Sequence, residues 1–154
     1  MDLILWRHAE AEVAPEGGDD LSRELTKKGE RQAARMAAWL DRHLPEGARV
    51  LVSPAARTQQ TVAPLARKFK LRDELVPETS VEDVLTLLKW DPETGPQLKG
   101  PVLLVGHQPY LGQLVAKLLG MKEDACPVRK GGVWWLRTRV RDGQPQTVLL
   151  TVAC

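Results

Sequence analysis

Apolar residues along this chain occur either in short unbroken runs or at the spacing of a helix. Residues 3–6, 49–52 and 102–105 form three runs dominated by apolar side chains, a pattern typical of strands that are covered on both faces. Residues 26–44 instead carry an apolar side chain at every third or fourth position, behind a threonine that can cap a helix. Because the two patterns alternate along the chain, they predict an α/β fold.

Further helices follow the second and third runs. Ser53 precedes Pro54, which predicts a helix start with Ser53 as the cap, and Pro64 should kink or split this helix. Ser80 should cap a short third helix, and the apolar residues Leu111, Leu114, Val115 and Leu118 have the spacing of a fourth. The segments left over, 9–24 and 91–101, are rich in polar residues, proline and glycine and are predicted to be loops.

Two C-terminal runs, residues 133–136 and 148–152, flank the turn sequence Asp142–Gly143 and predict a hairpin. The fold class expected is therefore α/β: a three-layer α/β/α sandwich with a mostly parallel central sheet and an antiparallel edge strand. Trp134 and Trp135 should point to opposite faces of their strand. We expect one of them in the core and the other exposed, where it could contact a partner.

Composition excludes several classes of protein. A chain of 154 residues suits a single domain spanning residues 1–154. Its 22 basic and 20 acidic side chains leave a net charge of +2, without the basic stripe that nucleic-acid binding requires. Cys126 and Cys154 are too few for a disulfide scaffold, and no apolar run is long enough for a membrane span or a signal peptide. We expect a cytoplasmic monomer that binds neither nucleic acid nor membrane.

Polar residues that could bind a ligand or take part in a reaction lie near the end of each of the three apolar runs. Arg7 and His8 follow the first run, Arg57 opens the helix after the second, and His107 follows the third. Ligands of open α/β sheets bind beyond the carboxyl ends of the strands, so these four side chains should share one crevice. Arginine binds phosphate oxygens in a forked geometry, and a neutral imidazole can attack phosphorus. The set favours phosphoryl transfer that requires no metal ion and no cofactor.

Other chemistries lack their essential residues. A cysteine phosphatase needs an arginine six positions after its cysteine, where Cys126 is followed by Gly132. The chain contains neither the glycine-rich nucleotide loop nor the His-Glu-x-x-His zinc motif. The His-x-Glu pattern of His8 to Glu10 has no Pro-Cys-x-x-Cys partner, which excludes a zinc deaminase.

Four segments resemble those of a known family. Leu3–Glu10 (LILWRHAE) looks like the signature of the histidine phosphatase superfamily, which includes the phosphoglycerate mutases. Leu25–Ala33 (LTKKGERQA), Ser53–Thr61 (SPAARTQQT) and Val105–Leu111 (VGHQPYL) are similar to stretches of its small SixA-type phosphohistidine phosphatase branch, in the same order and spacing. The resemblance implies a phosphoglycerate mutase-like fold.

The resemblance also implies a role for each of the four crevice residues. His8 would be the nucleophile that becomes phosphorylated, and Arg7 and Arg57 would clamp the phosphoryl oxygens. His107 would stabilise the group in transfer, and water would then release inorganic phosphate from His8.

The chain departs from the family pattern at two points. Ala9 stands where the wider superfamily has glycine, although alanine is usual in the SixA-type branch. The general acid of mutase-like members has its nearest match in Glu78, which could equally be a solvated residue before the Ser80 cap. Glu10 and Glu12 are further candidates.

Chain length bears on the substrate. Only 49 residues separate Arg57 from His107, which leaves no room for a cap domain. An open site suits a phosphohistidine displayed on a phosphorelay or phosphotransfer protein, which is the partner we expect. Two alternatives remain: a general small-molecule phosphomonoesterase of the same superfamily, and a phosphate-binding module without catalysis.

Overall fold

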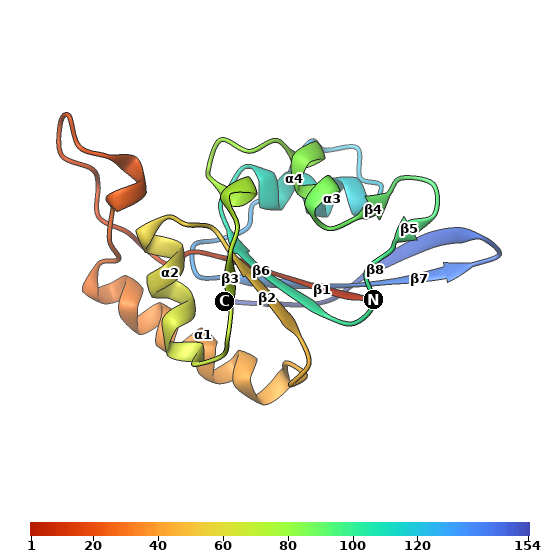
Figure 1. Cartoon of the computed structure of the whole chain (residues 1–154), viewed down its shortest axis with the longest axis horizontal. Helices are drawn as coiled ribbons and strands as arrows, with labels where there is room; N and C mark the ends of the chain where they lie inside the picture. The colour runs from red at the N-terminus through yellow and green to blue at the C-terminus, as the bar shows by residue number, and fades with distance from the viewer.

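The computed structural model describes residues 1–154 and contains one six-stranded sheet in the order β3–β2–β6–β1–β7–β8 (Figure 1). The strands are β1 Asp2–Arg7, β2 Arg49–Val52, β3 Lys70–Leu71, β6 Val102–Gly106, β7 Val133–Arg141 and β8 Gln144–Ala153. Strands β3, β2, β6 and β1 are parallel to one another, and β7 pairs antiparallel with both β1 and β8. The α/β fold with a mostly parallel sheet and an antiparallel edge is confirmed.

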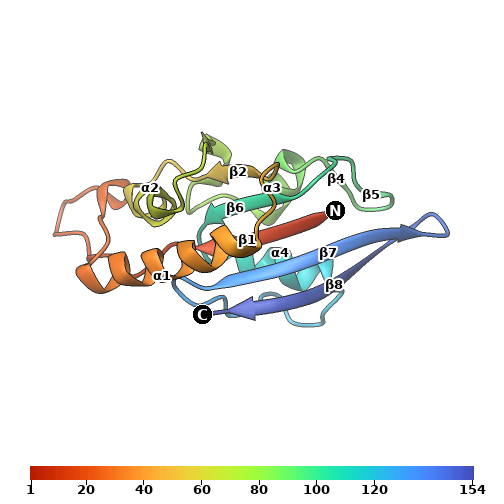
Figure 2. The same ribbon diagram turned by 90° about the horizontal axis from the view of Figure 1, so that it is seen from below.

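Helices cover both faces of the sheet. The helices are α1 Lys27–His43, α2 Ala56–Val62, α3 Val81–Leu87 and α4 Tyr110–Leu118, with short 3-10 turns at Asp20–Ser22, Ala63–Leu65 and Asp73–Leu75. Helices α1 and α2 lie on one face, and α3 and α4 lie on the other (Figures 1 and 2). None of them is both long and apolar enough to cross a membrane.

The sheet separates the two large clusters of the core, and a third cluster of four residues lies at Ala9, Ala11, Leu25 and Ala33. Leu3 and Leu5 of β1 pack in the cluster beneath α3 and α4, whereas Ile4 and Trp6 pack in the cluster beneath α1 and α2. All four side chains are at most 1% exposed. Because successive strand residues point to opposite faces, a strand covered on both sides needs an apolar residue at every position, which explains the unbroken runs.

Most of the predicted helix boundaries are confirmed. Thr26 caps α1 by accepting a hydrogen bond from the Gly29 amide at 2.9 Å, and Ser80 caps α3 in the same way. Pro64 ends α2, because the chain continues past Val62 as a 3-10 turn. At Gly29 a Cβ atom would collide with the carbonyl oxygen of Glu10, so glycine allows α1 to dock on the segment after β1.

Three local predictions were wrong or incomplete. Ser53 does not cap α2, which begins at Ala56 without any side-chain cap; the Ser53 amide still donates to Val105 of β6, so the chain has not yet left the sheet. Trp135 is buried as expected, but Trp134 is half-buried against the other cluster rather than exposed, because helices cover both faces. The 91–101 loop also takes part in a small hairpin, β4 Trp90–Asp91 with β5 Gly95–Pro96.

Candidate active site

Parallel pairing brings the two histidines together. Strands β1 and β6 are neighbours in register, with Arg7 opposite Gly106, so His8 and His107 leave the sheet side by side. The His8 amide donates to the Gly106 carbonyl at 3.1 Å, and the two imidazole ring centroids lie 5.3 Å apart. Arg7 and Arg57 lie close enough that their positive charges lower the pKa of both rings. The structure therefore brings together all four residues of the expected crevice.

The surroundings of His8 determine which ring nitrogen is free. Its Nδ1 lies 2.7 Å from the carbonyl oxygen of Ala9, and a carbonyl can only accept, so Nδ1 must carry the hydrogen. The Nε2 lone pair of the neutral ring is therefore available. Burial, and then the charges of Arg57 and Arg7, lower the pKa of His8 to about 4. At neutral pH the ring is uncharged and fit to act as a nucleophile.

A loop before β7 holds Arg7 and His8 in place. The Gly131 amide lies 3.1 Å from the Arg7 carbonyl and 2.9 Å from the His8 carbonyl, and the Arg7 amide donates to Gly132 at 3.1 Å. The Arg7 side chain donates from Nη1 to the Val128 carbonyl at 2.9 Å, while its buried Nε has no partner. Burial first, and then Arg57, lower the pKa of Arg7. Its charge is thus placed in a poorly solvated position where an anion would be well bound.

Ser53, predicted from the sequence to be a helix cap, belongs to the site. Its Oγ lies 2.8 Å from Nε2 of His107 and also accepts a hydrogen bond from the Ala55 amide at 3.3 Å. The hydroxyl has no other acceptor in the structure, so we assign its proton to the bond with His107 Nε2, and in this tautomer the hydrogen of the neutral ring is on Nδ1. That Nδ1 is buried without a partner. Burial, followed by the charge of Arg57, lowers the pKa of His107 to about 3, so the ring is neutral and Nδ1–H can donate to an anion.

Arg57 is buried but already contacts a carboxylate. Only 3% of the residue is exposed, and its Nη1 and Nη2 donate to the backbone oxygen and the carboxylate of Asp20 at 2.8 and 3.1 Å. Arg23 binds the other carboxylate oxygen of Asp20 at 3.1 Å. Burial would raise the pKa of Asp20, but the hydrogen bonds from Arg23 and Arg57 outweigh it and lower that pKa. Asp20 therefore occupies a position at which these arginines can hold an anion.

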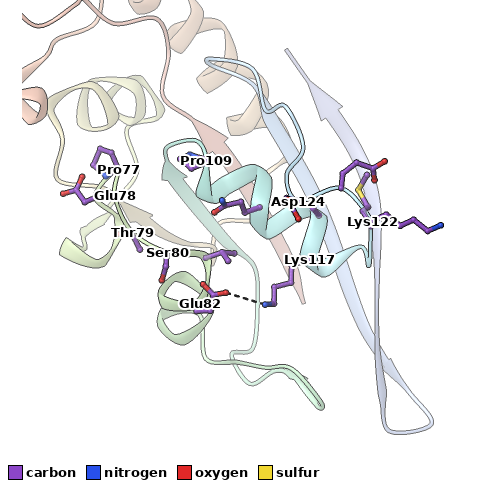
Figure 3. Close-up of a pocket in the computed structure, with 14 residues that line it drawn as sticks. Pro77, Glu78, Thr79, Ser80, Glu82, Pro109, Lys117, Lys122 and Asp124 are labelled. Carbon is purple, nitrogen blue, oxygen red and sulfur yellow. Dashed lines mark ion pairs between the residues drawn. The ribbon is translucent and has the colours of Figure 1, made fainter.

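None of the carboxylates proposed as general acids forms a hydrogen bond or ion pair with the four residues of the site. Glu78 is exposed, makes no hydrogen bond or ion pair, and lines a groove of about 720 Å³ between α3 and α4. In Figure 3 its carboxylate points away from Pro109, the residue of this groove nearest in sequence to His107. Glu10 accepts a hydrogen bond from the Thr26 hydroxyl at 2.8 Å and so helps to hold α1. Glu12 uses its backbone oxygen to accept from Arg23.

Comparisons with known proteins agree with this geometry. The model of the histidine phosphatase superfamily, branch 1, matches residues 3–80, just over half of the chain. The phosphohistidine phosphatase SixA homolog of Haemophilus influenzae is 32% identical over 135 residues, which cover 79% of each chain. The SixA phosphohistidine phosphatase of Escherichia coli is 33% identical over 121 residues, covering 77% of this chain and 74% of the relative.

A solved structure extends the likeness to the whole fold. The protein histidine phosphatase SixA complexed with tungstate is 25% identical, superposes with a TM-score of 0.76, and is matched over 99% of this chain and 96% of its own. Sequence and fold thus lead to the same assignment: the chain belongs to branch 1 of the histidine phosphatase superfamily, is a hydrolase of that superfamily, and is similar to its SixA phosphohistidine phosphatases.

Proposed function

We propose that this protein removes phosphate from phosphohistidine on phosphotransfer proteins through a phosphorylated His8. One observation carries the proposal: a buried, neutral imidazole with its Nε2 free lies beside two arginines and a second histidine whose Nδ1 has no partner. A nucleophile and several donors for the phosphoryl oxygens are the parts that phosphoryl transfer needs.

The reaction then has two steps. His8 Nε2 forms a bond to phosphorus as the bond between phosphorus and the substrate imidazole breaks, and the departing ring takes a proton from solvent. Water next attacks the phosphorus of phospho-His8, its oxygen replacing Nε2, which releases inorganic phosphate and a proton. In both steps Arg7 and Arg57 hold the phosphoryl oxygens, and His107 donates from Nδ1. The charge that a metal ion would otherwise supply comes from these side chains.

Two features favour phosphohistidine over a phosphate ester. An imidazole leaves with less help from a strong acid than an alkoxide does, and Glu78 forms no hydrogen bond or ion pair with the four residues of the site. The segment between Arg57 and His107 contains only short elements, of which the seven-residue α3 is the longest, so we infer a single domain with no cap domain over the site. The relatives in Haemophilus influenzae and Escherichia coli are named as SixA phosphohistidine phosphatases, which supports the same substrate class.

The experiment that tests the function compares substrate classes. A histidine phosphotransfer domain phosphorylated on its histidine is incubated with the protein, in parallel with a panel of sugar phosphates and other phosphomonoesters. We expect kcat/KM for the phosphoprotein to exceed that for every ester by at least about 100-fold. Turnover of esters alone would instead show a general phosphomonoesterase, and binding of phosphate without any turnover would show a phosphate-binding module.

A further inference from the structure

A basic hollow lies next to the site, on the side of α1. It has a volume of about 480 Å³ and is bounded by α1, by the loop before β7 and by the end of β8, which lie side by side in Figure 2. Four cations line it: Arg35 and Arg42 from α1, and Arg129 and Lys130 from the loop. No acidic side chain is among its lining residues.

None of these four cations is paired with an acidic side chain of the protein. All four are exposed, and none forms an ion pair or a side-chain hydrogen bond, whereas five other arginines are paired with carboxylates. Because the whole chain has a net charge of only +2, the hollow concentrates positive potential that the bulk charge conceals. A surface of this kind attracts an acidic partner and speeds its association.

The hollow also offers an apolar contact. Trp39 is half-buried in its wall, stacked on His43 with ring centroids 4.4 Å apart, and buried Met36 lies beside it. Arg35, Trp39 and Arg42 are spaced three or four residues apart and therefore share one face of α1. Tryptophan and arginine are the residues that most often dominate the binding energy of protein interfaces.

Backbone hydrogen bonds connect this hollow to the candidate active site. Gly131, which lines the hollow, donates its amide to the carbonyls of Arg7 and His8. A protein that presents a phosphohistidine to His8 therefore extends over the loop and the hollow. On the opposite flank, the groove that starts at Pro109 has the reverse balance, with four acidic side chains and two lysines. The two flanks would orient a partner of uneven charge in one direction.

We propose that the basic hollow docks an acidic segment of the phosphohistidine-bearing substrate protein. The inference rests on the function proposed above and names a binding surface for that substrate outside the catalytic crevice. The phosphoryl group is bound by the crevice, while Arg35, Arg42, Arg129 and Lys130 bind carboxylates that flank it on the partner.

The test uses two phosphohistidine peptides of equal length that differ only in carrying four glutamates or four glutamines around the phosphohistidine. With the full-length protein at low salt, we expect KM for the glutamate peptide to be about tenfold lower than for the glutamine peptide. The difference should shrink in 0.5 M NaCl, because salt screens exposed charges.

Charge reversal on α1 locates the effect. The double variant Arg35→Glu/Arg42→Glu should lose the preference for the glutamate peptide, with kcat within about twofold of wild type. The matched control, Arg139→Glu/Arg141→Glu, makes the same change of charge at two exposed, unpaired arginines of β7 and should keep the preference. If the reversed pair lowers the melting temperature, the milder Arg35→Gln/Arg42→Gln replaces it, with a smaller effect in the same direction.

Failure of the docking inference and failure of the function give different results. Wild-type hydrolysis of both peptides with equal KM, or an equal loss of preference in the β7 control, overturns the docking surface and leaves the function intact. If the Arg35→Glu/Arg42→Glu variant keeps the preference for the glutamate peptide, the docking surface is likewise overturned and the function is left intact. If the wild type hydrolyses neither peptide, the proposed function fails and the docking inference fails with it.

Discussion

The two halves of the candidate site are built in different ways. Arg7, His8 and His107 follow the ends of β1 and β6, and hydrogen bonds to neighbouring backbone groups or to buried Ser53 hold them. Arg57 lies on α2 and is held by Asp20, a loop residue whose side chain is 55% exposed. The strand half, which consists of Arg7, His8 and His107, keeps its geometry through partners that a ligand does not displace. The loop half, which consists of Arg57 and its partner Asp20, instead contains a carboxylate that competes with any incoming anion.

This difference indicates how the site divides its tasks. Donors fixed before the substrate arrives stabilise a transition state without reorganisation, and the strand half meets that requirement. The loop half instead exchanges one anion for another, so we expect it to influence phosphate affinity more than the chemical step. The following predictions test this division, beginning with the largest expected effect.

Removing the nucleophile from the strand half should abolish the reaction. His8→Ala eliminates the only group placed to accept the phosphoryl group, so kcat should fall by at least about 10⁴-fold. Acid-labile phosphoenzyme, measured with ³²P-labelled substrate, should disappear. Arg57→Ala, in the loop half, should lower the rate but still form phosphoenzyme. Full turnover by His8→Ala would show that the proposed mechanism is wrong.

The pH dependence of the wild type should also report the strand half. His8 acts as a nucleophile only when neutral, and its pKa is lowered to about 4, so the neutral form persists as pH falls and is lost only near pH 4. At pH 5 about 90% of the rings would be neutral, against about 3% for an ordinary histidine of pKa 6.5, a difference of about 30-fold. The measurement is kcat/KM from pH 3.5 to 8, corrected for ionisation of the substrate. A decline centred near pH 6.5 would mean that His8 is solvated.

Much of the strand half could be predicted from the sequence. Consecutive apolar residues identify β1, β2 and β6, and a parallel sheet places the carboxyl ends of its strands at one edge, so Arg7, His8 and His107 meet without knowledge of the packing. Arg57 follows from the same argument, because α2 begins just beyond β2. These predictions depend on local patterns and one rule of topology.

The remaining contacts depend on tertiary structure. Ser53 before Pro54 has the sequence pattern of a helix cap. Only the pairing of β2 with β6, which places His107 beside Ser53, shows that the Ser53 hydroxyl binds the imidazole of His107. Asp20 lies in a polar loop with no periodicity, so its pairing with Arg57, 37 positions later, leaves no signal in a single sequence. Glu78 has a plausible position in the sequence, but the structure gives its carboxylate no hydrogen bond or ion pair, so its role as a proton donor stays a prediction.

Ser53→Ala tests whether the second histidine needs its hydroxyl partner. Without the 2.8 Å contact, the neutral ring of His107 is no longer held in the tautomer that carries hydrogen on Nδ1, so kcat should fall about tenfold with little change in KM. Ser53→Thr, which keeps the hydroxyl, should recover much of the loss. The ¹⁵N chemical shifts of His107 should show Nδ1 protonated in wild type and a mixture of tautomers in Ser53→Ala. Unchanged shifts would mean that Ser53 has a structural role only.

Asp20→Asn should produce the smallest effect, and it acts on the loop half alone. The substitution removes the negative charge beside Arg57 while leaving the backbone oxygen that Arg57 also contacts. Inorganic phosphate, as a competitive inhibitor, should bind about three- to fivefold more tightly, the scale expected for one partly exposed ion pair. Asp19→Asn removes the same charge from the neighbouring residue, whose side chain binds the Leu21 amide rather than Arg57, and should leave the inhibition constant nearly unchanged. Tighter phosphate binding with kcat unchanged or lower is the result expected if Asp20 competes with the product. Weaker binding would instead show that Asp20 mainly orients Arg57, and the two halves of the site would then be equally preorganised.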